Sequence, residues 1–120
     1  MPRPKLLLLL LPVLVSGCGF GDTNDADGSA PAIQITQPAG TTVQGVVDFA
    51  ANVIDDRGVA VVEFYADEVL VGTDFTDPYL TRWNTLTSAD GTVILKVVAR
   101  DFSGNQSILS KNVTVENDPN

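Results

Sequence analysis

The sequence predicts an all-β fold, an antiparallel sandwich of about seven strands. Short runs rich in Val, Ile, Thr, Phe and Tyr follow one another from residue 32 onward. Gly, Pro, Asp and Asn punctuate these runs at intervals of about 8–12 residues. Within the runs apolar and polar residues alternate, and no stretch repeats its apolar residues with a helical period. Two stacked sheets are the way in which such a chain hides its apolar faces.

Four strands are expected in the first half of the folded part. Val47 and Phe49 alternate with Asp48, which gives this strand one buried face and one solvent-exposed face. The pair Asp67-Glu68 is short enough to join two neighbouring strands as a hairpin. The expected strands are 32–36, 46–54, 59–66 and 69–73.

Three more strands are expected in the second half, at 79–84, 92–100 and 107–116. Tyr79, Thr81 and Trp83 share one face of the first of them. Trp83 is therefore expected to fill the core between the sheets. The run from Ser88 to Gly91 is a turn signal that separates the first strand from the second.

Composition excludes several classes of function. The chain has 120 residues with a formal net charge of −8, one Cys and no His. If the leader is removed, five basic and 15 acidic residues remain, and the mature chain has a formal net charge of about −10. Nucleic acid is therefore not an expected partner, because its phosphates need Lys and Arg. A disulfide within the chain, a two-thiolate metal site and a His general base are excluded as well.

The first 17 residues have the layout of a secretory signal peptide. Arg3 and Lys5 precede an apolar run at 6–15, which Pro12 interrupts. About ten apolar residues span roughly 15 Å as a helix, and a bilayer core is about 30 Å thick. The run is thus too short to be a transmembrane anchor.

The end of that run, Val15-Ser16-Gly17-Cys18, resembles the lipobox of bacterial lipoproteins. The resemblance implies cleavage between Gly17 and Cys18 and a lipid on the Cys18 thiol, so that the partner of the N-terminus is a membrane. Gly19 stands where an Asp would retain such a lipoprotein in the inner membrane of enteric bacteria. The resemblance therefore implies a location in the cell envelope, at the outer membrane of a Gram-negative bacterium.

Four segments are expected along the chain. Residues 1–17 form the signal peptide, 18–30 the lipidated Cys and a tether, 31–117 the sandwich, and 118–120 a C-terminal tail. The tether is rich in Gly, Asp, Ser and Asn, so it buries too little apolar surface to offset the entropy of ordering it.

The folded part resembles a bacterial immunoglobulin-like domain of the kind found as accessory modules in secreted and surface proteins. The resemblance covers about residues 31–116 and rests on the order of its turn motifs. One departure is Glu68, where the family usually has Gly. Such domains are implied to be non-catalytic spacers or interaction modules. The motifs are Pro38-Ala39 with Gly45, Asp55-Asp56-Arg57-Gly58-Val59, Val62-Glu63-Phe64-Tyr65-Ala66-Asp67, Val71-Gly72-Thr73-Asp74, Pro78-Tyr79 with Trp83, Ala89-Asp90-Gly91, and Ala99-Arg100-Asp101 with Gly104-Asn105.

Two turns repeat the pattern Asp-x-x-Gly, at Asp55 to Gly58 and at Asp101 to Gly104. In an immunoglobulin topology both turns lie at one end of the sandwich. Turn chemistry accounts for the pattern, because Asp accepts backbone N–H bonds and Gly supplies positive φ. A calcium site formed by Asp55, Asp56 and Asp101 is the functional alternative.

A second candidate is a surface contact made by Tyr65, Phe75 and Phe102 with an envelope protein or a glycan. Enzymatic activity is not expected, because a sandwich of this size offers no deep cleft for a pair of catalytic carboxylates. The leading hypothesis is a non-catalytic envelope lipoprotein that presents one structural or interaction module. The alternative is a carbohydrate- or calcium-binding module at the cell envelope, with calcium as the one cofactor considered.

Overall fold

The computed structural model describes residues 29–118, and they form the expected β-sandwich. The predicted signal peptide, its cleavage site at Gly17 and Cys18, and most of the tether lie outside the described residues. The described elements, in chain order, are β1 (Ala32–Gln37), β2 (Thr42–Val43), β3 (Val46–Ile54), β4 (Val59–Ala66), β5 (Val69–Asp74), β6 (Tyr79–Asn84), the 3₁₀ turn η3 (Thr85–Thr87), β7 (Gly91–Asp101) and β8 (Gln106–Val115).

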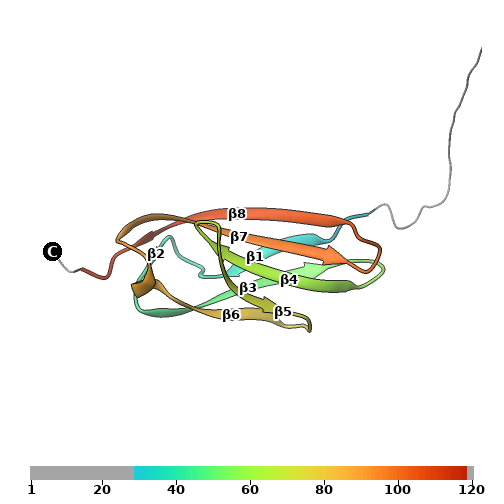
Figure 1. Cartoon of the computed structure of the whole chain (residues 1–120), viewed down its shortest axis with the longest axis horizontal. Coiled ribbons are helices and arrows are strands. Elements are labelled where there is room, and N and C mark those ends of the chain that lie inside the picture. Colours follow the sequence, from blue (N-terminus) through green and yellow to red (C-terminus); the bar gives the residue numbers. More distant parts are fainter. Residues whose placement is uncertain (1–28, 119–120) are drawn as a thin grey trace, which may run out of the picture.

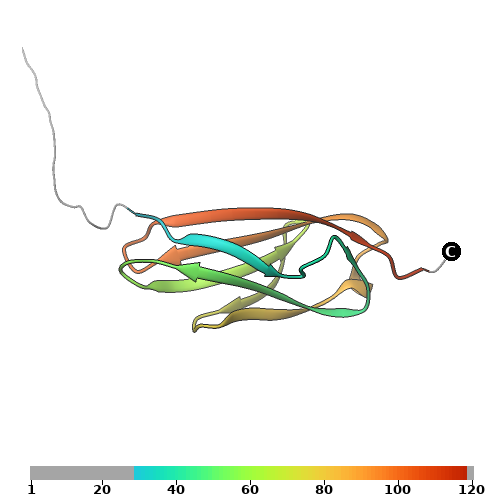
Figure 2. The same cartoon turned by 180° about the vertical axis from the view of Figure 1, so that it is seen from behind.

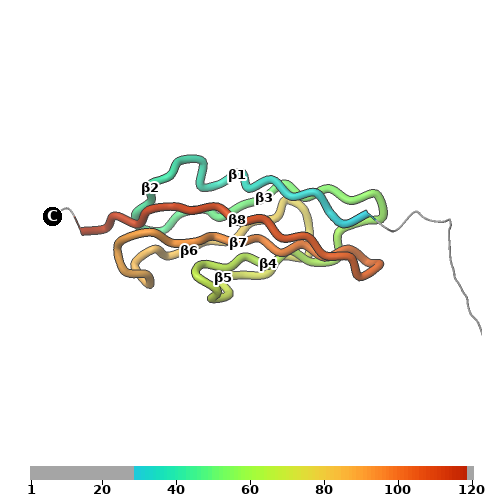
Figure 3. Tube along the Cα trace, turned by 90° about the horizontal axis from the view of Figure 1, so that it is seen from above, coloured from blue at the N-terminus to red at the C-terminus, as the bar shows by residue number. Residues whose placement is uncertain are grey.

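The strands form two sheets that pack face to face. One sheet has the order β1-β3-β6 and the other β2-β8-β7-β4-β5. Figures 1 and 2 show the sandwich from its two sides, and in Figure 3 β1 and β3 lie in one layer while β7, β4 and β5 lie in the other. All pairings are antiparallel except that of β2, which runs parallel to β8.

The core follows the period-two alternation of the sequence. Phe49 of β3 and Phe64 of β4 meet at its centre, with ring centroids 4.9 Å apart in an edge-to-face arrangement. Trp83 is 2% exposed and belongs to the same cluster, as expected. Burying a large apolar side chain contributes roughly 1.5–3 kcal/mol. The other buried apolar residues are Val43, Ala51, Val53, Val62, Ala66, Tyr79, Val93, Leu95, Val97, Val98, Ala99, Val113 and Val115.

The hairpin between β4 and β5 uses two residues in the left-handed region. Asp67 has φ 48° and Glu68 has φ 68°. Two consecutive positive φ values match the right-handed twist of the flanking strands. Asp67 also ties the hairpin to β7, because its N–H donates to Ile94 O and its Oδ1 accepts from Ile94 N, both at 2.9 Å. Glu68 lacks the conformational freedom of Gly, so the turn carries a steric cost of about 1 kcal/mol.

One side of the sandwich is closed where β1 lies alongside β8. Ser107 Oγ donates to Pro31 O at 2.5 Å, and Lys111 Nζ donates to Pro38 O at 2.5 Å. The chain then leaves the β1 sheet and joins the other sheet as β2, where Thr114 N donates to Thr41 O at 2.7 Å. The same segment therefore belongs to both sheets and covers the gap between them.

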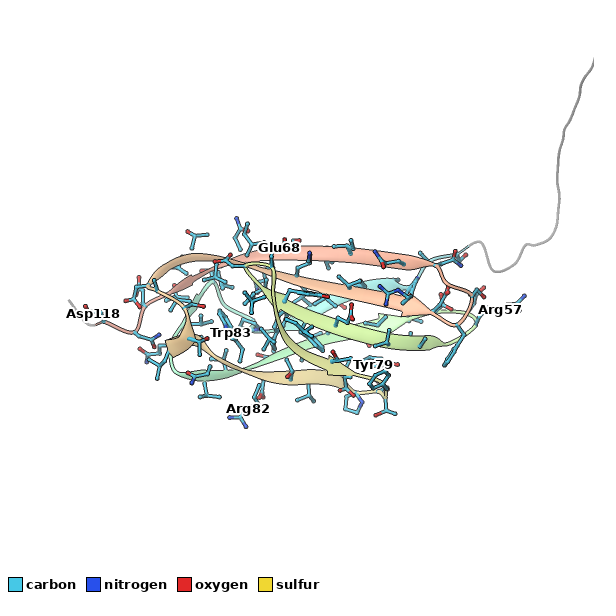
Figure 4. All side chains as sticks on the ribbon, in the orientation of Figure 1. Arg57, Glu68, Tyr79, Arg82, Trp83 and Asp118 are labelled. Carbon is cyan, nitrogen blue, oxygen red and sulfur yellow. The ribbon has the colours of Figure 1, made fainter. Side chains whose placement is uncertain are left out.

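The two ends of the described chain lie at opposite ends of the sandwich. Ser29 is near the β7–β8 turn, where its carbonyl accepts from Asn105 Nδ2 at 3.4 Å. At the other end Asp90 accepts hydrogen bonds from the backbone N–H groups of Asn117 and Asp118. Figure 4 shows Arg57 and Asp118 at these opposite ends. No helix within residues 29–118 has the length and apolar character needed to cross a bilayer.

Candidate functional site

The opposite side of the sandwich is open. It is bounded by β5, the last strand of one sheet, and β6, the last strand of the other. The two strands are close at one point, because a Cβ on Gly72 would be only 2.7 Å from Thr81 Cβ. Next to this point Leu80 N donates to Asp74 Oδ2 at 3.1 Å. From there toward the β4–β5 hairpin the two strands separate.

A cleft of about 700 Å³ lies between the two strands where they separate. Its volume is within the range of small-ligand sites, so the expectation that a sandwich of this size has no such cleft is wrong. Core residues Ala66, Trp83 and Val93 form its floor, so the cleft reaches the hydrophobic core. Figure 4 shows Trp83 on the inner side of β6 and the preceding residue, Arg82, on its outer side. The remaining lining residues are Asp67, Val69, Leu70, Val71, Arg82, Asn84, Thr87, Ser88, Ala89, Asp90, Gly91 and Thr92.

The edge strand beside the cleft is apolar and exposed. Val69 is 67% exposed and Leu70 52% exposed. Leu70 is opposite Tyr65 across the β4–β5 ladder, and a bulge between Phe64 and Tyr65 leaves Val71 packed against the core. The outward N–H and C=O groups of a sheet's last strand have no ladder partner, so such a strand is a template for pairing with another chain.

Acidic side chains flank this edge strand at both ends. Asp67 and Glu68 precede it and Asp74 ends it, while Val69 to Thr73 carry no charge. Lys96 Nζ pairs with Glu68 Oε1 at 2.6 Å, which offsets one of these charges. Arg82, on the opposite rim of the cleft, pairs with Asp48 at 3.2 Å, and both side chains are exposed.

The Asp101 side chain accepts hydrogen bonds within the turn that follows β7. Its side chain is 3% exposed, and its Oδ1 accepts from Ser103 N at 2.9 Å and Asn105 N at 2.8 Å. Asn105 Nδ2 donates to Oδ2 at 3.1 Å. Burial raises the pKa of this carboxyl, but the hydrogen bonds outweigh burial and the pKa is below its ordinary value of 3.8. Asp101 therefore stabilises the fold above that value, and this contribution is lost as the pH falls through the lowered pKa.

The proposed calcium ligands lie at the expected end of the sandwich. Val59, which follows the first turn, pairs with Asp101 across the β4–β7 ladder. Asp55 Oδ2 accepts from Arg57 N at 2.9 Å, whereas its Oδ1 is buried without a hydrogen-bond partner. Asp56 is exposed. Between residues 29 and 118 no three acidic, Cys or His side chains come together as a metal site. Calcium binding stays a prediction.

The three aromatic residues of the predicted surface contact lie on separate elements. Tyr65 is half-buried in β4, where Lys96 Nζ is 4.9 Å from its ring centroid and Glu63 Oε1 accepts from its hydroxyl at 3.2 Å. Burial, and then the Glu63 carboxylate, raises the pKa of that hydroxyl above 10.0. Phe75 is exposed between β5 and β6, and Phe102 is exposed in the β7–β8 turn beside Gly58. The sandwich does not gather them into one aromatic surface.

A polar cluster at the Asp118 end of the sandwich could not be predicted from the sequence. Thr85 is fully buried, and its Oγ1 donates to Gly45 O at 2.7 Å. Asn117 Oδ1 accepts from Gly45 N at 2.8 Å, and Asn117 Nδ2 donates to Thr85 Oγ1 at 3.1 Å. These three residues are far apart in the sequence, so neither a motif nor a period could have connected them.

Comparison with known proteins agrees with this architecture. The family model described as Bacterial Ig domain matches residues 31–97, more than half of the chain. The chain belongs to this family. The match spans β1 to the middle of β7, so it includes the β4–β5 hairpin and every strand that borders the cleft of this bacterial Ig domain. No curated protein matches the chain.

Two solved structures share the fold of this bacterial Ig domain. One, from a study of the fibronectin(III)-like modules of Clostridium thermocellum CbhA, is 22% identical, with a TM-score of 0.59 over 72% of this chain and 97% of that one. The other, the endo-β-1,4-mannanase of Thermotoga petrophila, is 16% identical, with a TM-score of 0.63 over 77% of this chain. The match spans 21% of the mannanase. At these identities the likeness concerns the fold alone.

Proposed function

We propose that this protein is a non-catalytic envelope lipoprotein that presents one Ig domain as an interaction module. The observation that carries the proposal is the position of the N-terminal entry. The chain enters the domain beside the β7–β8 turn, at the end opposite Asp118. A lipid on Cys18 would hold that end toward the membrane, and the open side with β5 would face the surroundings.

The proposal contains no catalytic step. Asp101, the buried carboxylate of the described chain, accepts three hydrogen bonds from its own turn and stabilises that turn. Its lowered pKa keeps it ionised and hydrogen-bonded, which does not suit a general acid. A glycan- or peptide-hydrolysing activity of the purified chain that disappears in Asp101→Asn or Asp55→Asn would contradict the non-catalytic role.

The anchor is tested in whole cells with the full chain. Wild type is expected in the membrane fraction, with a mass that lacks residues 1–17 and carries acyl chains. Cys18→Ala is expected to remain an uncleaved precursor or to leave the membrane. Ser16→Ala keeps a small residue before the cleavage site and serves as the control that fractionates like wild type. An unchanged mass and fractionation of Cys18→Ala would refute lipidation.

A ligand-binding module is the second candidate function. The orphan Oδ1 of Asp55, at the same end as Asp101, favours calcium as the ligand, because a buried carboxylate oxygen without a partner is costly. Calorimetric titration with calcium and thermal melts with and without EGTA test it. An absence of heat and an unchanged melting temperature at millimolar calcium would remove it.

The glycan form of this candidate rests on the fold shared with the endo-β-1,4-mannanase and on Tyr65. Tyr65 lies on the outer face of the larger sheet with Glu63 and Lys96 beside it. The aromatic ring could stack on a sugar while the two charged side chains form hydrogen bonds with its hydroxyl groups. Affinity electrophoresis through soluble β-1,4-mannan should retard wild type more than Tyr65→Ala. Equal mobility with and without the polysaccharide would remove the glycan form.

A further inference from the structure

We propose that the open edge at β5 binds an extended peptide segment with basic ends, which adds to the five-stranded sheet as a further strand. The inference rests on the proposed role as an interaction module and names the chemistry of its partner. It combines four features of the open side, namely the free edge, the cleft beside it, the apolar side chains on it and the acidic residues that flank it.

The edges of the two sheets differ in how they are covered and in which residues they carry. β1 is held against β8 through Ser107 and Lys111, and β2 is only two residues long. β5 and β6 are both six-residue edge strands without the Lys or Pro that protects exposed edges in many β-proteins, but β6 carries the exposed Arg82 whereas β5 carries no basic residue. A strand added beside β5 would pair with backbone groups that have no partner in the ladder.

The space beside β5 widens along the strand. The two sheets touch at Gly72 and Thr81 and diverge toward Val69. Alternate side chains of an added strand would point into the cleft, toward Val71 and Trp83, and the others would lie over Leu70 on the outside. The segment is therefore expected to carry Val or another small apolar residue at every second position.

The charge around β5 selects the class of partner. The uncharged stretch from Val69 to Thr73 lies between Asp67-Glu68 at one end and Asp74 at the other, with Asp77 shortly beyond. A second copy of this chain pairing through β5 would place acidic residues opposite acidic residues, whether the strands ran parallel or antiparallel. A segment with Lys or Arg at both ends would place opposite charges there. Charge thus disfavours self-pairing and favours a basic-ended partner.

The test measures fluorescence anisotropy of a labelled peptide, lysine-valine-threonine-valine-threonine-valine-lysine, with the full chain in mild non-ionic detergent. Saturable binding to wild type is expected. Leu70→Lys should weaken it about tenfold or more, because it adds a repelling charge at the edge. Ile108→Lys is the matched control, since Ile108 is 55% exposed on β8, at the far side of the same sheet. It should change affinity less than about twofold.

Two altered peptides separate backbone pairing from unspecific attraction. N-methylation of the five residues between the lysines removes the N–H groups that would pair with β5 in either strand direction, and binding should be lost. Replacement of both lysines by glutamate should weaken binding about tenfold or more. Equal affinity of the methylated peptide would overturn the added strand, and equal affinity of the glutamate peptide would overturn the charge argument.

Absence of saturable binding by any of the peptides, with wild type folded by circular dichroism, would overturn the inference. So would dimerisation of wild type in sedimentation that Leu70→Lys abolishes, because β5 would then pair with a second copy. Val69→Lys repeats the test if Leu70→Lys fails to fold. None of these results depends on Cys18, so failure here leaves the membrane anchor standing, and failure of the Cys18→Ala test leaves the docking edge standing.

Discussion

The two long sides of this sandwich join the same two sheets in different ways. On the β1–β8 side the chain crosses from one sheet to the other, and Ser107 and Lys111 donate hydrogen bonds to carbonyls of the β1 segment. On the β5–β6 side contact is confined to the region of Gly72, Thr81 and Asp74, and a cleft opens beyond it. The difference shows that a small sandwich can be sealed by one segment shared between its sheets while the other side stays accessible.

The open side depends on one large side chain. Trp83 packs in the core and forms part of the floor of the cleft, so Trp83→Ala should cost about 3–5 kcal/mol of unfolding free energy, the largest effect expected here. Urea denaturation measures it, and Trp83→Phe provides a smaller truncation if the alanine variant does not fold. Arg82→Ala, the neighbouring exposed residue, should cost less than about 1 kcal/mol. Equal losses would show that Trp83 does not support the open side.

The point of contact on the open side requires Gly. A Cβ on Gly72 would overlap Thr81, so Gly72→Ala should push β5 away from β6 and cost about 1–3 kcal/mol. Gly40→Ala is the control, because nothing lies within 4 Å of the Cβ it would introduce. Thermal melts of the two variants give the comparison. A Gly72→Ala variant as stable as wild type would mean that the two strands are not held together there.

The closed side should be sensitive to Lys111. Removal of its hydrogen bond to Pro38 O in Lys111→Met leaves a carbonyl without its partner and should cost about 1 kcal/mol. Arg82→Met, which removes an exposed ion pair at the open side, should change the denaturation midpoint little. If both substitutions had the same effect, the two sides would be held with similar strength.

The smallest effect that we expect is an increase in stability. Glu68 has φ 68°, which Gly adopts without a steric cost, so Glu68→Gly should raise the free energy of unfolding by about 0.5–1 kcal/mol. Glu68→Ala loses the same contact with Lys96 but keeps a Cβ, and it should not stabilise the domain. Stabilisation by both variants would attribute the effect to charge instead of backbone conformation.

Much of the fold could be predicted, because its causes are local. Alternation placed the strand around Phe49 and the buried position of Trp83, and turn chemistry explained why Asp101 accepts from Ser103 N while Gly104 has φ 94°. The fold class and the immunoglobulin-like family are confirmed. Strand β2 was missed because its two residues are held by pairing with β8, which no local pattern encodes.

The candidate sites were less predictable for the same reason. Tyr65 is half-buried and Phe75 and Phe102 are exposed, but only the folded arrangement shows that the three rings do not form one surface. The cleft depends on the distance between the last strands of two different sheets, and residues such as Leu70 and Thr87 that line it are far apart in the sequence. Spacing along one chain cannot specify that distance.

The most direct test of the difference between the two sides is a residue-resolved NMR titration of the isotope-labelled full chain with the lysine-ended peptide. We expect the amide signals from Val69 to Thr73 and the Trp83 indole signal to shift together and saturate, while the amide signals of β1 stay in place. Shifts confined to β1 and β8, or spread over acidic residues at both ends of the sandwich, would contradict this expectation.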